Sequence, residues 1–198
     1  MVLNGHDGGL DREIEFPGLD TSHSLTVLGL GPAAEHTVNV TVIDGNGNES
    51  DWPDPLVVVT ETLPADFPPL ALNASEPSLM EPGVTLFSVN RTGSDDIYSL
   101  LMVLDPAGEV AWFYRTDHTI ADVRRIENGH LLYETGLGAD ADFIEIDMAG
   151  NVVEKWYGSS RTEPDPGGIS VDVEYPHHEI FEMPTGNLLT LGAELRSV

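Results

Sequence analysis

Hydrophobic and polar residues alternate with a period of two along much of this chain, which is typical of short β-strands. Valine occupies every second position of residues 38–42, and Val110, Trp112 and Tyr114 alternate with Glu109 and Ala111. Residues 100–104 are continuously apolar and are predicted to form a strand that is buried on both faces. Glycine or proline interrupts every window with a helical period within a few residues. The pattern therefore predicts an all-β chain.

Two tight turns each occur twice in the sequence. An Asp-x-x-Gly turn begins at Asp105 and recurs at Asp147, 42 residues later, and a Trp and a Tyr follow each copy. A second turn ends at Gly129 and recurs at Gly186, 57 residues later, each time before two leucines and a strand pattern. A self-similar unit of about 40–50 residues, made of strands and tight turns, is typical of propeller blades. Residues 84–198 are therefore predicted to form about two blades of a β-propeller.

The first 62 residues have a different pattern and are predicted to form a β-sandwich. They resemble the C-terminal part of a fibronectin type III module, in the motifs Leu30-x-Pro32, His36-x-Val38-x-Val40 and Asp44-x-x-Gly47-Asn48-Glu49-Ser50. The family usually has tyrosine where His36 stands. A whole module has about 90–100 residues, so this immunoglobulin- or fibronectin-like sandwich is predicted to be incomplete.

Residues 63–83 are rich in proline and are predicted to form an extended, semi-rigid linker. The propeller that follows needs roughly 4–8 blades to close its ring. About two blades would expose unpaired strand edges. We therefore expect that the chain is part of a longer protein, cut at both ends.

The composition excludes several classes of function. The 198 residues carry a formal net charge of −26, and Lys155 is the one lysine. This charge repels nucleic acid and anionic membranes, and no run of 18 apolar residues predicts a membrane-spanning helix. With no cysteine, disulfides, thiolate catalysis and cysteine-based zinc sites are excluded. The acidic surface suits either ordinary solubility or a saline habitat.

The N-terminus shows no basic region followed by an apolar stretch, so no signal peptide is visible. Glycosylation sequons nevertheless begin at Asn39, Asn48, Asn73 and Asn90. Such sequons suit a secreted, glycosylated protein.

The densest cluster of titratable residues is His177-His178-Glu179, which precedes the second Gly-containing turn. Neighbouring side chains of an extended segment point to opposite faces, so one histidine is expected to face any given pocket. That histidine would be a nucleophile, an acid–base group or a metal ligand. The alternative is one exposed histidine and one that is hydrogen-bonded near a turn. No His-x-x-x-His spacing supports a metal site.

Two other groups of residues allow a functional and a purely structural interpretation. Four acids in loops, Asp140, Asp142, Asp165 and Asp172, are either Ca²⁺ ligands or solvated side chains, and no Asp-x-Asp-x-Asp-Gly loop is present. The pair Arg124-Arg125 would either hold an anion bidentately or pair with acids of this acidic chain.

The order of these motifs resembles the early part of the PAPS-independent arylsulfotransferases, over about residues 63–195. The matching motifs lie in residues 80–87, 103–114 and 177–189. The resemblance implies a β-sandwich-like domain followed by a six-bladed propeller. It also implies sulfuryl transfer from a phenolic sulfate ester to a phenol through a sulfated histidine. The partners would be these two small molecules and no PAPS cofactor would be used, while Ca²⁺ stays open. Members of the family are often exported, which implies an extracellular or periplasmic protein.

The resemblance assigns one of the family's active-site histidines to this chain. His178 is favoured because it directly precedes an acid, and His177 is nearly as good a candidate. The implied role is that of a hydrogen-bond donor and charge stabiliser. The sulfated histidine and its arginine partner would belong to later blades, so the chain alone is expected to be inactive. The alternative function is a non-catalytic extracellular module that binds glycans or proteins, because propellers host many unrelated functions.

Overall fold

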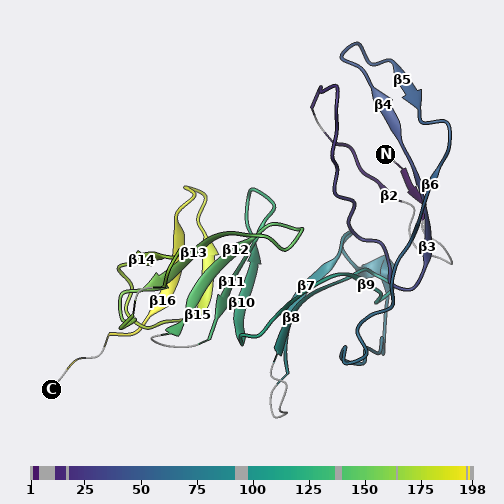
Figure 1. Cartoon of the computed structure of the whole chain (residues 1–198). Helices are drawn as coiled ribbons and strands as arrows, with labels where there is room; N and C mark the ends of the chain where they lie inside the picture. The colour runs from purple at the N-terminus through teal and green to yellow at the C-terminus, as the bar shows by residue number, and fades with distance from the viewer. Residues whose placement is uncertain are drawn as a thin grey trace. The chain divides into compact units, whose positions relative to one another are not determined.

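The computed structural model describes residues 2–4, 12–16, 18–91, 98–136, 140–163, 165–194 and 196. Regular structure in these residues consists of strands and one short 3₁₀ helix, η1 (Pro77–Leu79). The prediction of an all-β chain is therefore confirmed (Figure 1). Within the described ranges, no helix has the length and apolar character needed to cross a membrane.

The chain divides into two compact units, one of residues 1–85 with 103–112 and one of residues 86–102 with 113–198. The predicted linker at residues 63–83 contains η1 and no strand. The predicted domain boundaries themselves stay a prediction.

The N-terminal strands form a four-stranded sheet and a separate hairpin. The sheet has the order β2-β1-β3-β6, and β4 pairs antiparallel with β5. On β3 every second side chain is buried, as the alternating valines predict, and the buried His36 Nε2 donates to the carbonyl oxygen of Gly31 at 2.9 Å. A ring that reaches back to an upstream carbonyl is also a feature of immunoglobulin-like sandwiches, where tyrosine makes the contact. These sheets are consistent with a partial sandwich, whose strands are β1 (Val2–Asn4), β2 (Arg12–Glu13), β3 (Glu35–Asn39), β4 (Thr41–Ile43), β5 (Glu49–Asp51) and β6 (Leu56–Val59).

Three further sheets follow along the chain and are consistent with partial propeller blades. The first has the order β7-β8-β9, and the second has the order β10-β11-β12-β13-β14, in which β14 runs parallel to β13. The third is the hairpin β15-β16. Their strands are β7 (Thr85–Arg91), β8 (Tyr98–Leu104), β9 (Val110–Thr116), β10 (Ile120–Arg125), β11 (Leu131–Thr135), β12 (Asp142–Ile146), β13 (Val152–Gly158), β14 (Ile169–Val171), β15 (Pro176–Glu182) and β16 (Leu188–Gly192). None of these described strands closes a ring.

The repeated Asp-x-x-Gly turns have the same structure. The Oδ1 atoms of Asp105 and Asp147 each accept from the backbone N–H groups two and four residues later, at 2.8–3.0 Å. Gly108 and Gly150 adopt φ angles of 82° and 86°, which favour glycine. The hydrogen bond from the Asn151 side chain is the main cause that lowers the pKa of Asp147. Each copy links the last two antiparallel strands of its sheet, so the repeat is a structural unit.

The sheet β10–β13 has one face toward β9 and the other toward β15. The Tyr133 ring of β11 lies 6.1 Å from the Tyr114 ring of β9, between centroids. Its neighbour Leu132 packs instead with Phe143 of β12 and Ile180 of β15 in a buried cluster. Because side chains alternate along a strand, residues 132 and 134 of β11 face β15.

Asn90 connects the end of β7 to the start of β10. Its amide group donates to the carbonyl oxygen of Ile120 at 2.8 Å and accepts from the Ile120 N–H at 2.9 Å. The Ser99 hydroxyl also donates to this amide, at 2.6 Å. The Asn90 side chain thus makes the two hydrogen bonds to Ile120 that the backbone of a paired strand would otherwise make. Among the four sequon asparagines, Asn48 and Asn90 have their amide nitrogens in hydrogen bonds, to Asp44 and to Ile120, that an attached glycan would disrupt.

Candidate functional site

The two histidines singled out from the sequence lie at an irregularity of β15. His177 pairs with Leu191 of β16, while Ile180 pairs with the adjacent Thr190. Two residues, His178 and Glu179, are therefore inserted into β15 relative to its partner strand. Bulges of this kind redirect side chains and are frequent near active sites.

The backbone around the histidines is strained. His178 has a φ of 68° and Tyr175 a φ of 43°, in the left-handed region that non-glycine residues seldom adopt. Such outliers tend to cluster at functional sites. The strain therefore points to the same short segment as the titratable cluster does.

The bulge brings the two imidazoles together. The Nδ1 atoms of His177 and His178 are 3.0 Å apart, and the rings meet edge to face with centroids 5.0 Å apart. His177 is half-buried and His178 is exposed. The expectation that the two side chains point to opposite faces is wrong, because the bulge breaks the alternation of the strand. A hydrogen bond between the Nδ1 atoms requires one of them to carry a proton and the other to accept it.

The preceding sheet has a bulge at the equivalent position, with different residues. Ile120 pairs with Thr135 and Asp122 with Glu134, so Ala121 is inserted. Ile120 and His177 each lie nine residues before the glycine of the following turn, Gly129 and Gly186. The two first strands, β10 and β15, thus share a backbone irregularity, and the histidines distinguish the second.

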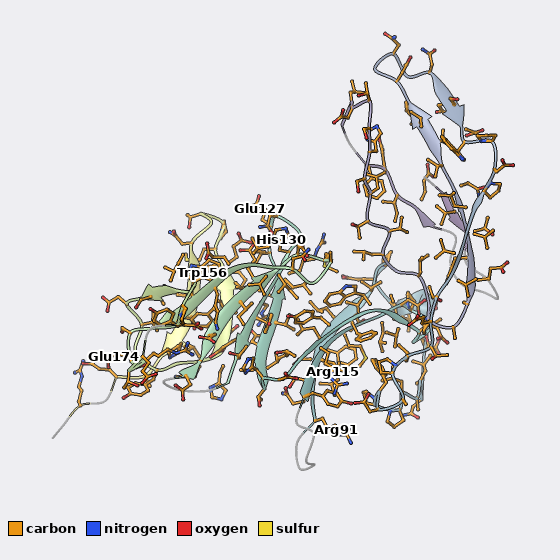
Figure 2. All side chains as sticks on the ribbon, viewed as in Figure 1. Arg91, Arg115, Glu127, His130, Trp156 and Glu174 are labelled. Atoms are coloured by element: carbon orange, nitrogen blue, oxygen red, sulfur yellow. The ribbon has the colours of Figure 1, made fainter. Side chains whose placement is uncertain are left out.

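The strand β10 and the turn after it contact β15 at three successive points. Asp122 Oδ2 accepts from the backbone N–H of Ile180 at 3.3 Å. Arg124 donates through Nε to Asp122 and through Nη2 to Glu179, at 3.1 Å in both cases. Beyond them, the backbone N–H of Glu127 donates to a carboxylate oxygen of Glu182 at 2.6 Å. Figure 2 shows Glu127 in the turn after β10, beside His130, whose Nδ1 lies 2.6 Å from Glu145 Oε1. The sequence allowed Arg124 either an anion or neighbouring acids as partner, and the acids are its partners.

A buried acid lies beside this contact. Glu134 is 0% exposed, and neither of its carboxylate oxygens has a hydrogen-bond partner in the described structure. It pairs across the strands with Asp122 on one side and with Phe143 on the other. Burial, and secondarily the charge of Asp122, raises the pKa of Glu134 to about 7. The carboxyl group of Glu134 is therefore about half protonated near neutral pH.

Sequence reasoning did not identify Glu134 as a site residue. The available signal was an acid inside the apolar run of β11, because a charged group is seldom buried without a partner.

The acids considered as Ca²⁺ ligands are engaged differently. Asp142 and Asp165 both pair with Lys155 and Arg161, in a network that connects β12, β13 and the loop after β13. Salt bridges to Lys155 and Arg161 lower the pKa of Asp165, with the Lys155 hydrogen bond as the main cause. Asp140 and Asp172 are exposed. Among the residues that the structure describes, no three His, Asp or Glu side chains are grouped as metal ligands would be.

A second group of basic residues lies at one end of the sheet β7-β8-β9. The guanidinium carbons of Arg91 and Arg115 lie 5.3 Å and 3.9 Å from the ring centroid of the buried Tyr98. Figure 2 shows Arg91 and Arg115 near each other at this end. The group adds cation–π contacts to the packing of this sheet.

The model of one protein family, Arylsulfotransferase (ASST), matches residues 71–197, which is more than half of the chain. The chain belongs to the arylsulfotransferase family. Comparisons with curated proteins and with solved structures gave no match. The matched segment of this arylsulfotransferase-family chain begins before β7 and includes all of β16. It therefore contains the histidine bulge, Arg124 and Glu134, whereas the N-terminal strands β1–β6 all lie outside it. The fibronectin-like character of those sheets stays a prediction.

Proposed function

We propose that this chain forms part of the active site of an enzyme that transfers a sulfuryl group from a phenolic sulfate ester to a phenol. In this proposal the site lies at the bulge of β15, and His178 and His177 contact the sulfuryl group. The observation that carries the proposal is the imidazole pair itself. Two histidines, 3.0 Å apart at a strained bulge, lie inside the segment that matches the family.

The transfer has two covalent steps. A neutral imidazole nitrogen of another histidine attacks the sulfur atom, an N–S bond forms, and the S–O bond to the donor breaks to release a phenolate. The oxygen of the acceptor phenol then attacks the same sulfur, the N–S bond breaks, and the phenol gives up its proton. Charge builds on the sulfuryl oxygens and on the leaving phenolate oxygen in the first step. Hydrogen-bond donors placed at these oxygens lower the barrier.

The histidines of β15 are suited to this donor role. When one Nδ1 of the pair accepts from the other, the Nε2 atom of the accepting ring carries a proton and is able to donate. The other imidazole keeps its proton in the bond between the rings and so fixes the tautomer of its neighbour. Exposure of His178 leaves its ring accessible to a small substrate.

A transfer assay tests the proposed function. The polypeptide encoded by the complete reading frame is mixed with p-nitrophenyl sulfate and phenol. We expect release of p-nitrophenolate that depends on phenol and equals the amount of phenyl sulfate formed. A folded protein that releases none, or that forms sulfate ions in place of phenyl sulfate, would contradict sulfuryl transfer to a phenol. Binding of glycans in place of turnover would favour the non-catalytic alternative.

A further inference from the structure

Arg124 lies where the first strands of two neighbouring sheets meet. Its side chain contacts Asp122 of its own strand β10 through Nε and Glu179 of the β15 bulge through Nη2. Arginine can make these two contacts at once because its guanidinium group is planar and carries donors on several edges. Glu179 directly follows His178 in the two-residue insertion. Arg124 therefore contacts the bulge next to the residue with the strained backbone.

The same cluster fixes the other end of the insertion. Asp122 Oδ2, which accepts from Arg124, also accepts from the backbone N–H of Ile180. Ile180 is 1% exposed and belongs to the apolar cluster with Leu132 and Phe143. Asp122 thus ties the bulge to the buried core, and Arg124 orients Asp122.

The charges at this place oppose the approach of an anion. A phenolic sulfate ester is negatively charged, and Asp122, Glu179 and Glu182 all lie on or against the β15 segment that carries the histidines. Like charges repel most strongly where the surroundings are partly desolvated. Arg124 is the cation that contacts two of these three carboxylates, so it removes part of the repulsion.

From this geometry we propose that Arg124 is a positioning residue of the histidine site, which holds the β15 bulge in its observed conformation and neutralises the carboxylates beside it. The proposal rests on the proposed function, since it deepens the description of the same site. Arg124 acts through Asp122 and Glu179, and it need not touch the sulfuryl group.

Two variants separate the positioning effect from the charge effect. Arg124→Gln removes both the charge and the ionic contacts. Arg124→Lys keeps the charge, but a single ammonium group does not reproduce the two-edged contact of the guanidinium. Arg125→Gln is the matched control, because Arg125 is adjacent in β10 and, by alternation, faces the opposite side of the strand.

The first readout is amide hydrogen exchange in the 198-residue chain, followed at Ile180. Exchange should become about threefold to tenfold faster in Arg124→Gln and in Arg124→Lys, a range set by the modest strength of partly exposed ion pairs. It should be unchanged in Arg125→Gln. Unchanged exchange at Ile180 in both Arg124 variants would overturn the positioning role, whatever the enzyme does.

The second readout is the affinity of the complete polypeptide for p-nitrophenyl sulfate and for uncharged phenol. Arg124→Gln should weaken binding of the sulfate ester about tenfold and leave phenol binding unchanged, because the lost charge acts on the anion. Arg124→Lys should retain most of the sulfate-ester affinity. If the wild-type protein binds the ester and Arg124→Gln binds it equally well, the charge role is wrong while the proposed function stands. If the wild-type protein does not bind the ester, the proposed function fails, and hydrogen exchange still decides whether Arg124 holds the bulge.

Discussion

Replacing His178 with alanine is expected to lower the kcat of sulfuryl transfer about 100-fold, as the loss of one preorganised donor to developing charge does in other enzymes. The physical reason is that the substitution removes both a donor to the sulfuryl group and the partner of His177 at 3.0 Å. Initial rates of p-nitrophenolate release measure the effect in the polypeptide from the complete reading frame. Since the lost interaction belongs mainly to the transition state, KM should change little.

The control for this experiment is His118→Ala. His118 is exposed in the loop between β9 and β10, outside the bulge. Its replacement should leave kcat unchanged. His177→Ala should also slow transfer, because it removes the group that fixes the tautomer of His178. A fully active His178→Ala protein would show that the donor role is assigned to the wrong residue.

Replacing Glu134 with glutamine should stabilise the folded chain above neutral pH. The unfolded chain loses this proton near the ordinary pKa of 4.5, whereas burial keeps the folded-state pKa at about 7. Below pH 4.5 the carboxyl group is protonated in both states, and its ionisation does not change the free energy of unfolding. Between pH 4.5 and pH 7 the carboxyl group is ionised in the unfolded chain but still protonated in the folded chain. The free energy of unfolding therefore falls as pH rises toward the folded-state pKa. At about 1.4 kcal/mol per pKa unit, a shift from 4.5 to about 7 costs about 3 kcal/mol of stability above pH 7.

Urea unfolding of wild type and Glu134→Gln at pH 4.5 and at pH 8 measures this effect. The free energy of unfolding of the variant should match that of wild type at pH 4.5 and exceed it by about 3 kcal/mol at pH 8. Glu109→Gln is the matched control, because Glu109 is exposed in the turn between β8 and β9. The free energy of unfolding of Glu109→Gln should equal that of wild type at both pH values. A Glu134→Gln variant that is no more stable than wild type at pH 8 would mean that Glu134 is not a buried, unpartnered acid.

The regular part of the fold was predictable from the sequence because its signals are local. Alternating valines, an apolar run and Asp-x-x-Gly turns each act within a few residues, and residues 100–104 are indeed buried throughout except for the half-buried Leu104. The repeated turns predicted equivalent hairpins for the same reason. Short-range patterning of this kind largely decides the secondary structure.

The arrangement of the site was only partly predictable. The sequence identified the segment with His177 and His178, but it predicted opposite orientations, because register shifts depend on the partner strand β16. Glu134 was missed because its burial follows from the packing of β15 on β11, which connects residues far apart in the sequence. Arg124 was noticed as a basic side chain, yet its partner Glu179 is 55 residues away. Long-range contacts of this kind carry no local pattern.

The most direct test of the site is to map an aryl sulfate onto the chain by NMR. Isotope-labelled 198-residue chain is titrated with p-nitrophenyl sulfate, and the backbone and imidazole signals are followed. We predict that the perturbed signals belong to His177, His178 and their neighbours on β10 and β15, and that the remaining neighbours are still perturbed in His178→Ala, whose KM is expected to change little. Saturable perturbation confined to residues outside β10 and β15, or no perturbation at millimolar ester, would contradict the location of a sulfate-ester site at the β15 bulge.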